Sequence, residues 1–242
     1  MLNSKITPRP ASTLILTRDA SCGLEVFLMQ RTQQAAFMPG YYVFPGGVVD
    51  PMDYSDSMLS LCSIDDAEAS RMLGLEQGGL AYVIAAIRES FEEVGLLLAH
   101  DTHGEYIEIA EAGDVEYYAG LRERLNSGQL TFADVFRTRG LSAAVEKLAF
   151  FSHWITPVGL PRRYDTRFFV AAAPELQTAV PDGQEAVDHV WLAPAEALEL
   201  GGRGELSLSL PTISTLRELA SFTTTDALIK HARRPRIVQP IL

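Results

Sequence analysis

AYVIAAIRESFEEVGLLL, residues 81–98, is the segment of this sequence whose structure is most clearly indicated. Its alanine, isoleucine, arginine and glutamate residues favour a helix, and Gly95 is a typical C-terminal stop. Residues three and four positions apart share one face of a helix, so Glu89, Glu92 and Glu93 are expected to lie together. The opposite face is apolar and can pack on a sheet; it carries Ile84, Ile87, Phe91 and Val94.

Three carboxylates on one helical face repel each other, which raises the pKa of at least one of them unless something compensates. Two arrangements would relieve this repulsion: the face points into water, or it binds a hard divalent cation that prefers oxygen ligands. Most acidic helical faces are solvated surface. Here, however, the upstream stretch FPGGVVDPMD, residues 44–53, contains paired glycines that let the backbone turn tightly near a ligand, and two further acids.

The segments around this helix predict an α/β layered domain. Apolar or β-branched runs bounded by polar residues predict strands at 12–18, 24–31, 147–157, 164–174 and 189–194, and an extended segment at 41–50. Further helices are predicted at 65–73, 194–200, 211–222 and 224–234, and in short pieces between 115 and 148 that break near Gly128 and Gly140. No internal repeat and no change in composition calls for a second domain.

Composition excludes several classes of protein. The 242 residues carry a formal net charge of -11 without a basic block, which argues against a large nucleic-acid surface. The two cysteines are far apart in the sequence and no apolar stretch could span a membrane, so we expect a cytoplasmic protein in a reducing compartment. The sequence motifs of P-loop kinases, zinc peptidases and serine hydrolases are absent.

RESFEEVGL, residues 88–96, together with Gly47, resembles the Nudix box, G-x5-E-x7-R-E-U-x-E-E-x-G-U, where U is aliphatic. Ser90 stands at one aliphatic position, and Asp53 stands where the family has glutamate. Gly47 and Arg88 are 41 positions apart against 14 in the plain pattern, so about 27 residues are inserted inside the box.

An enlarged box is typical of the coenzyme A diphosphatase-like branch, which 28–50 and 153–174 also resemble. The second arginine that this branch carries before Gly40 is absent here. The resemblance implies a Nudix α/β/α sandwich with a mixed β-sheet and helical insertions. It predicts one domain over 1–242, with an insertion at about 51–79 that shapes specificity at the site mouth and a C-terminal helical extension from about 203.

The resemblance implies a hydrolase dependent on Mg²⁺ or Mn²⁺, in which water attacks a diphosphate linkage. Coenzyme A or an acyl-CoA is the first expected substrate, giving 3',5'-ADP and a phosphopantetheine. ADP-ribose, NADH and dinucleoside polyphosphates are rival substrates, and a non-catalytic nucleotide-binding regulator is a further alternative. The expected partner is a small-molecule nucleotide, and whether the protein forms a homodimer stays open.

By the same resemblance, Glu89, Glu92 and Glu93 are metal ligands, joined by the Gly47 carbonyl. The predicted catalytic residues are Glu92, Glu89 and Arg88, of which Arg88 orients a catalytic glutamate. The base that deprotonates water is one of these three glutamates or a glutamate elsewhere, with Glu185 as a loop candidate.

Four arginines are candidates for substrate phosphate contacts, because the guanidinium fork suits phosphate oxygens. For each of them the alternative is a structural ion pair; Asp165 is a candidate acid for the last three. The four are Arg31, Arg162, Arg163 and Arg167. Two alternatives also remain for Asp50 and Asp53, which either hold a metal indirectly or cap the inserted segment.

Overall fold

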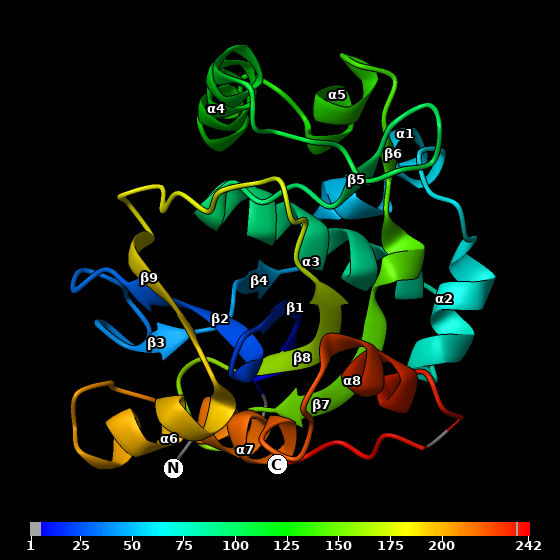
Figure 1. Cartoon of the computed structure of the whole chain (residues 1–242). Coiled ribbons are helices and arrows are strands. Elements are labelled where there is room, and N and C mark those ends of the chain that lie inside the picture. The colour runs from blue at the N-terminus through cyan, green and yellow to red at the C-terminus, as the bar shows by residue number, and fades with distance from the viewer. Residues whose placement is uncertain (1–5, 236) are drawn as a thin grey trace.

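The fold is seen in a computed structural model that describes residues 6–235 and 237–242. The domain predicted over 1–242 therefore includes six residues, 1–5 and 236, that lie outside the described part. Within that part, a mixed seven-stranded sheet runs through the middle of the molecule (Figure 1). Its strands are β1 (Arg9–Ala20), β2 (Gly23–Arg31), β3 (Tyr42–Val43), β4 (Gly46–Val48), β7 (Ala149–Ile155), β8 (Tyr164–Ala172) and β9 (Ala186–Leu192).

Strand β1 organises this sheet. It pairs in parallel with β8 along its length, and antiparallel with β4 near its start and with β2 near its end. Successive side chains of a strand point to opposite faces. Leu14 and Leu16 accordingly belong to the core on one face, and Ile15 to the core on the other. A strand buried on both faces reads as a continuous apolar run, which is why STLILTR was recognisable as a strand.

Helices cover both faces of the sheet, which confirms the α/β/α sandwich (Figure 1). The long helix α3 (Gly79–Val94) packs on one face, and α6 (Pro194–Gly202), α7 (Leu210–Leu219) and α8 (Thr225–Ala232) pack on the other. Beyond α3 lie α4 (Ala112–Asn126) and α5 (Phe132–Arg137) as a further layer. Within the described residues, no helix combines the length and apolar character that crossing a bilayer requires.

The inserted segment forms helices beside α3. It contains η1 (Pro51–Tyr54), α1 (Asp56–Leu59) and α2 (Asp66–Leu73), and α2 confirms the helix predicted at 65–73. Asp66 on α2 accepts the backbone N–H groups of Gly78 and Leu80, and Ser70 accepts that of Gly79. These bonds satisfy donors that a helix start leaves unpaired, so α3 begins two residues earlier than predicted.

The predicted helix stop at Gly95 is confirmed, whereas residues 96–98 of the segment predicted at 81–98 lie beyond the helix end. Gly95 adopts a left-handed conformation (φ +75°), and its N–H donates to Phe91, so the helix stops at Val94. The following residues 96–98 are buried but extended, and they lead into β5 (Ala99–His100). Strand β5 pairs with β6 (Ser142–Ala143), so the region 115–148 is not helical throughout, although the 3-10 helix η2 (Val145–Lys147) follows.

Gly79 permits close contact between α2 and α3, because a Cβ there would lie 2.5 Å from the Cα of Ser70. We expect Gly79→Ala to lower the free energy of unfolding by about 1–3 kcal/mol, since backbone atoms cannot move aside cheaply. Gly120→Ala in α4 is the matched control, because no atom lies within 4 Å of that Cβ position. The control should be neutral or stabilise by up to about 1 kcal/mol. Urea unfolding of both variants measures the difference, and an equal effect would contradict this packing.

Candidate active site

Arg88 lies at the centre of the carboxylate cluster on α3, and all five of its N–H groups are used. Nε and Nη2 donate to the two carboxylate oxygens of Asp53 at 2.9 and 3.1 Å. Nη1 donates to Glu89 at 2.9 Å and to Glu92 at 2.7 Å, and Nη2 also donates to the Val48 carbonyl at 2.9 Å. The guanidinium therefore joins α3 to β4 and to the inserted segment, and it orients two glutamates at once.

Asp53 is almost completely buried. Of the two roles considered for it from the sequence, metal binding and capping of the inserted segment, it is seen in the second. It accepts the N–H of Asp50 at 2.8 Å, and the Asp50 side chain accepts the backbone N–H of Asp53 in return, which closes a capping box at the start of η1. The Asp50 side chain also accepts the N–H of Met52. The same carboxylate makes the bidentate pair with Arg88. The shorter acid at the family's glutamate position thus still supplies the partner of the box arginine.

Glu93 and Glu89 face the paired glycines of β4. Glu93 Oε2 accepts the N–H of Gly46 at 2.8 Å, whereas Oε1 is buried and has no hydrogen-bond partner. A Cβ on Gly47 would lie 2.5 Å from Glu89 Cδ, so glycine at this position leaves room for the Glu89 carboxylate where it stands. Arg31 Nη1 lies 3.9 Å from Glu93 Oε1, which brings the predicted Arg31 to the same site.

The three glutamates lie in an environment that disfavours their charge. Burial raises the pKa of Glu89 to about 7, and the charge of Glu92 adds to this effect against the opposing effect of Arg88. Burial also raises the pKa of Glu92, and raises that of Glu93 well above its ordinary value with a further contribution from Glu89. The charge of Glu185, an exposed loop residue, raises the pKa of all three, so this carboxylate lies within electrostatic reach of the cluster.

The cluster is rich in carboxylate oxygens, the ligand type that hard divalent cations prefer. Four carboxylates meet two guanidinium groups, and one buried oxygen of Glu93 lacks a hydrogen-bond partner. Among the described residues, however, no group of three or more Asp, Glu, His or Cys side chains is arranged so that it could hold a metal ion. Magnesium in particular is usually held by one or two carboxylates with water and substrate phosphates, so an open site of this kind suits it.

The C-terminal end of α3 is held by residues that sequence reasoning missed. Arg122 on α4 donates from Nε to the Glu92 carbonyl at 2.9 Å and from Nη1 to the Val180 carbonyl at 2.6 Å. Asn126 donates to the same Glu92 carbonyl at 3.2 Å. The N–H groups of Val180 and Asp182 donate to the carbonyls of Val94 and Glu93. A cation at the negative end of the helix dipole is favourable, and this arrangement joins α3 to the loop that carries Glu185.

The other predicted arginines lie apart from the glutamates and do not form one cluster. Arg167 is buried on β8, pairs with Asp165 and lies 4.9 Å from the ring centre of Tyr82. Arg163 donates to the backbone carbonyls of Thr156 and Ile6, and Arg162 is exposed in the loop before β8. Their roles in substrate binding stay predictions.

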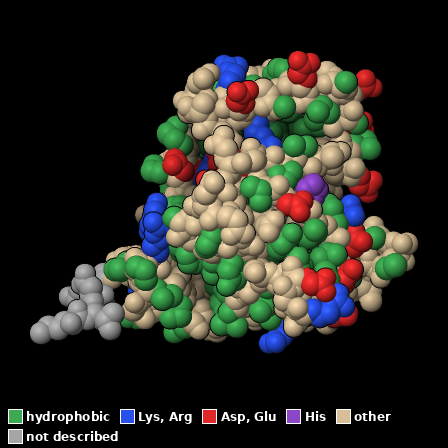
Figure 2. Space-filling view, turned by 90° about the vertical axis from the view of Figure 1, so that its left-hand side faces the viewer, with side chains coloured by type: hydrophobic (Ala, Val, Ile, Leu, Met, Phe, Trp, Pro, Cys, Tyr) green, Lys and Arg blue, Asp and Glu red, His purple; other side chains and the backbone are tan. Residues whose placement is uncertain are grey.

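Figure 2 shows the side of the molecule that faces left in Figure 1. For the described residues of this face, basic side chains form small separate groups among acidic and apolar ones rather than a continuous patch. The described residues of this face therefore form no broad basic patch of the kind that binds a nucleic acid.

Comparisons with known proteins agree with this geometry. A family model described as "NUDT19 Nudix domain" matches residues 64–219, which include α3. The acyl-coenzyme A diphosphatases NUDT19 of Homo sapiens and Gallus gallus are 30% and 29% identical to this chain over 239 and 252 residues. Each alignment covers 86% of this chain and 64% of the relative, so the chain spans less than two thirds of these relatives.

One solved structure is similar over nearly its whole length. A NUDIX hydrolase from Alicyclobacillus acidocaldarius superposes with a TM-score of 0.73 at 27% sequence identity. The superposition covers 93% of this chain and 96% of that chain, so the inserted segment and the C-terminal helices do not set the overall architecture apart.

The raised pKa of Glu89 makes the metal-free protein sensitive to pH. Between pH about 4.5 and 7 the folded protein binds more protons than the unfolded chain, so the free energy of unfolding should fall as pH rises through this window. We expect a loss on the order of 2–3 kcal/mol, and Mg²⁺ at pH 8 should reverse part of it. Unfolding with and without EDTA measures this effect.

Glu89→Gln should reduce the slope of the pH profile, because the amide does not titrate and differs little from the carboxyl in shape. Glu92 and Glu93, whose pKa values are also raised, should account for the remaining slope. Glu116→Gln, an exposed position on α4, is the control and should leave the profile unchanged. A wild-type profile without slope, or an unchanged slope in Glu89→Gln, would contradict the assignment to Glu89.

Arg122→Met should lower the free energy of unfolding by about 1–3 kcal/mol, because two backbone carbonyls lose a donor. Hydrogen exchange at Val180 and Asp182 should accelerate, since their acceptors lie on the helix end that Arg122 holds. Arg124→Met, at an exposed position two residues along α4, should change neither quantity. Equal protection of both amides in Arg122→Met and wild type would show that the loop does not depend on this arginine.

Proposed function

The chain belongs to the family of NUDT19 Nudix domains, and from this membership we propose that it hydrolyses the diphosphate linkage of coenzyme A or an acyl-CoA. The products would be 3',5'-ADP and a phosphopantetheine or its acyl derivative. Support comes from the acyl-coenzyme A diphosphatases to which the chain is similar. The single structural observation that carries the proposal is the buried Oε1 of Glu93, which has no hydrogen-bond partner and lies 3.9 Å from Arg31 Nη1 in a cluster of carboxylates.

The proposed cofactor is Mg²⁺ or Mn²⁺, held by Glu89, Glu92, Glu93 and the Gly47 carbonyl. A divalent cation at this place would supply charge neutralisation for the diphosphate and would lower the pKa of a bound water. Arg88 fixes Glu89 and Glu92 through two N–H groups of one nitrogen, so their orientations are coupled. The Gly46 N–H fixes one oxygen of Glu93 and leaves the other toward Arg31.

The proton of the attacking water would pass to a carboxylate. Four carboxylates are within electrostatic reach of one another at the site, and they are Glu89, Glu92, Glu93 and Glu185. Arg31 lies next to Glu93 at the edge of this group, and the two form a weak ion pair. A substrate phosphate bound to Arg31 would offset the loss of that ion pair. Arg162, on an exposed loop, is the candidate for a phosphate further from the linkage.

A product assay tests this function. Purified protein with Mg²⁺ is incubated separately with coenzyme A, acetyl-CoA, ADP-ribose, NADH and diadenosine polyphosphates, and the products are separated by chromatography. We expect 3',5'-ADP from coenzyme A or acetyl-CoA. Glu92→Gln should lower kcat/KM at least about 100-fold, because it removes a charged oxygen from the predicted metal and water site.

Glu116→Gln on α4 is the matched control and should keep wild-type turnover. Cleavage of another nucleotide alone would leave the chemistry in place and overturn the substrate. Binding of nucleotides without any cleavage would favour a regulator in place of an enzyme.

A further inference from the structure

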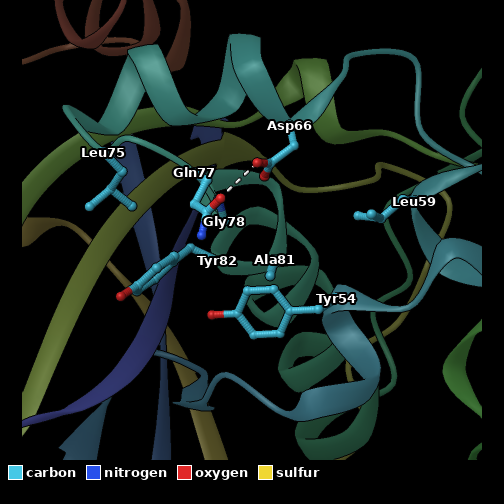
Figure 3. Close-up of a pocket in the computed structure, with 8 residues that line it drawn as sticks. All are labelled: Tyr54, Leu59, Asp66, Leu75, Gln77, Gly78, Ala81 and Tyr82. Carbon is cyan, nitrogen blue, oxygen red and sulfur yellow. Dashed lines mark hydrogen bonds between the residues drawn. The ribbon is translucent and has the colours of Figure 1, made fainter.

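A pocket of about 460 Å³ lies between the inserted segment and the first turns of α3 (Figure 3). Two tyrosines form one side of it, and in Figure 3 their hydroxyl groups point in the same direction. The inserted segment supplies Tyr54 from η1 and most of the other lining, while α3 supplies Tyr82. The residues that matter for its chemistry are Tyr54, Leu59, Asp66, Leu75, Ala81 and Tyr82.

The lining is unsuited to an anion. No lysine, arginine or histidine is among the described residues that line the pocket. The start of a helix often binds phosphate through free N–H groups. Here, however, Asp66 accepts those of Gly78 and Leu80 at 2.8 and 2.9 Å, and Ser70 accepts that of Gly79 at 2.9 Å. A ligand in this pocket must therefore carry no negative charge where it touches the wall.

The pocket and the glutamates lie along one face of α3. Tyr82 and Glu89 are seven residues apart, which is two helical turns or about 10 Å. The neighbouring sheet connects the same two places. Ser12 on β1 pairs with Gly47 of β4 on one side and with Arg167 of β8 on the other. Ser12 donates to the carbonyl of Tyr82 at 2.6 Å. Gly47 approaches Glu89, so one row of the sheet extends from the carboxylates toward the pocket.

A substrate could extend from Glu89 in two directions, and the side chains on these two sides differ in charge. On the Glu93 side lies Arg31, which is suited to a phosphate. On the Tyr82 side lies Arg167, but its charge is already compensated by Asp165. The half of the substrate that carries an additional phosphate is therefore favoured on the Arg31 side, and an uncharged half on the side of the pocket.

We propose that this pocket binds the uncharged pantetheine arm of the substrate, together with any acyl group on its sulfur. This inference rests on the proposed function and names the subsite for its non-nucleotide half. Leu59, Leu75 and Ala81 supply apolar contacts for the arm, and the tyrosine hydroxyls supply donors for its amide oxygens. Because the inserted segment builds most of the wall, the insertion would select substrates that carry such an arm.

Binding of the two product halves tests the subsite without turnover. The full chain with Mg²⁺ is titrated with 4'-phosphopantetheine and, separately, with 3',5'-ADP, and Kd is measured by calorimetry or ligand-observed NMR. Each probe carries at least one phosphate, but only 4'-phosphopantetheine carries the arm and only 3',5'-ADP carries the nucleoside. Leu75→Glu places a charge in the apolar wall, and Tyr54→Ala removes one of the two rings.

We expect both variants to weaken 4'-phosphopantetheine at least about 10-fold, since roughly 1.4 kcal/mol of contact energy corresponds to that factor. Binding of 3',5'-ADP should stay within about twofold of wild type. Met52→Ala is the control: this exposed side chain lies on the same short helix as Tyr54 and does not line the pocket. It should change neither Kd.

A loss of 3',5'-ADP binding with 4'-phosphopantetheine unaffected would place the adenine here and overturn the proposal. Equal effects on both probes in folded variants, or no effect on either, would overturn it too. Tyr54 is 45% exposed, so its variant keeps the test valid even where Leu75→Glu fails to fold. Failure of the proposed function is read separately, as absence of coenzyme A cleavage by the wild-type protein.

Discussion

The bidentate pair between Arg88 and Asp53 connects the inserted segment to the helix that carries the glutamates. Both side chains are largely buried, and burial of charged groups costs free energy that only a complete set of hydrogen bonds offsets. Arg88 meets this condition with all five N–H groups bonded, and Asp53 with contacts to both Arg88 and a backbone N–H. The insertion is therefore not an independent loop, because an ion pair joins its first turn to the helix α3.

Backbone groups of β4 position two further carboxylates, those of Glu89 and Glu93. Gly46 donates its N–H to Glu93, while a Cβ on Gly46 would meet Ser12 and Thr13 of β1; at Gly47 the absence of a Cβ leaves room for the Glu89 carboxylate over the strand. The fold thereby holds carboxylates in a region that disfavours their negative charge. A divalent cation would stabilise the charged form of these carboxylates. At the same C-terminal end of α3, Arg122 and Asn126 donate to the Glu92 carbonyl, so the backbone of this glutamate is fixed as well.

These constraints bear on specificity as well as on chemistry. The glutamates lie toward the C-terminal end of α3 with Arg31 beside Glu93, and the pocket with its two tyrosines lies near the start of the helix. A substrate with one strongly anionic half and one uncharged half matches this asymmetry. Ser90 shows that the helix also tolerates a polar residue at a family aliphatic position, because its buried hydroxyl donates to the Leu96 carbonyl at 3.0 Å just beyond the helix end.

The sequence by itself determined the elements whose signals are local. The spacing of Glu89, Glu92 and Glu93, the stop at Gly95 and the apolar runs of β1 and β2 depend on neighbours within a few residues, and the structure has each of them. Only the tertiary structure decided the partners far apart in the sequence: Asp53 and Arg88 are 35 residues apart, Arg122 and Glu92 are 30, and Gly46 and Glu93 are 47. Such pairs leave no periodic pattern, because the packing of whole elements brings them together. For the same reason the sequence predicted an insertion near the site but not the pocket that it forms with α3.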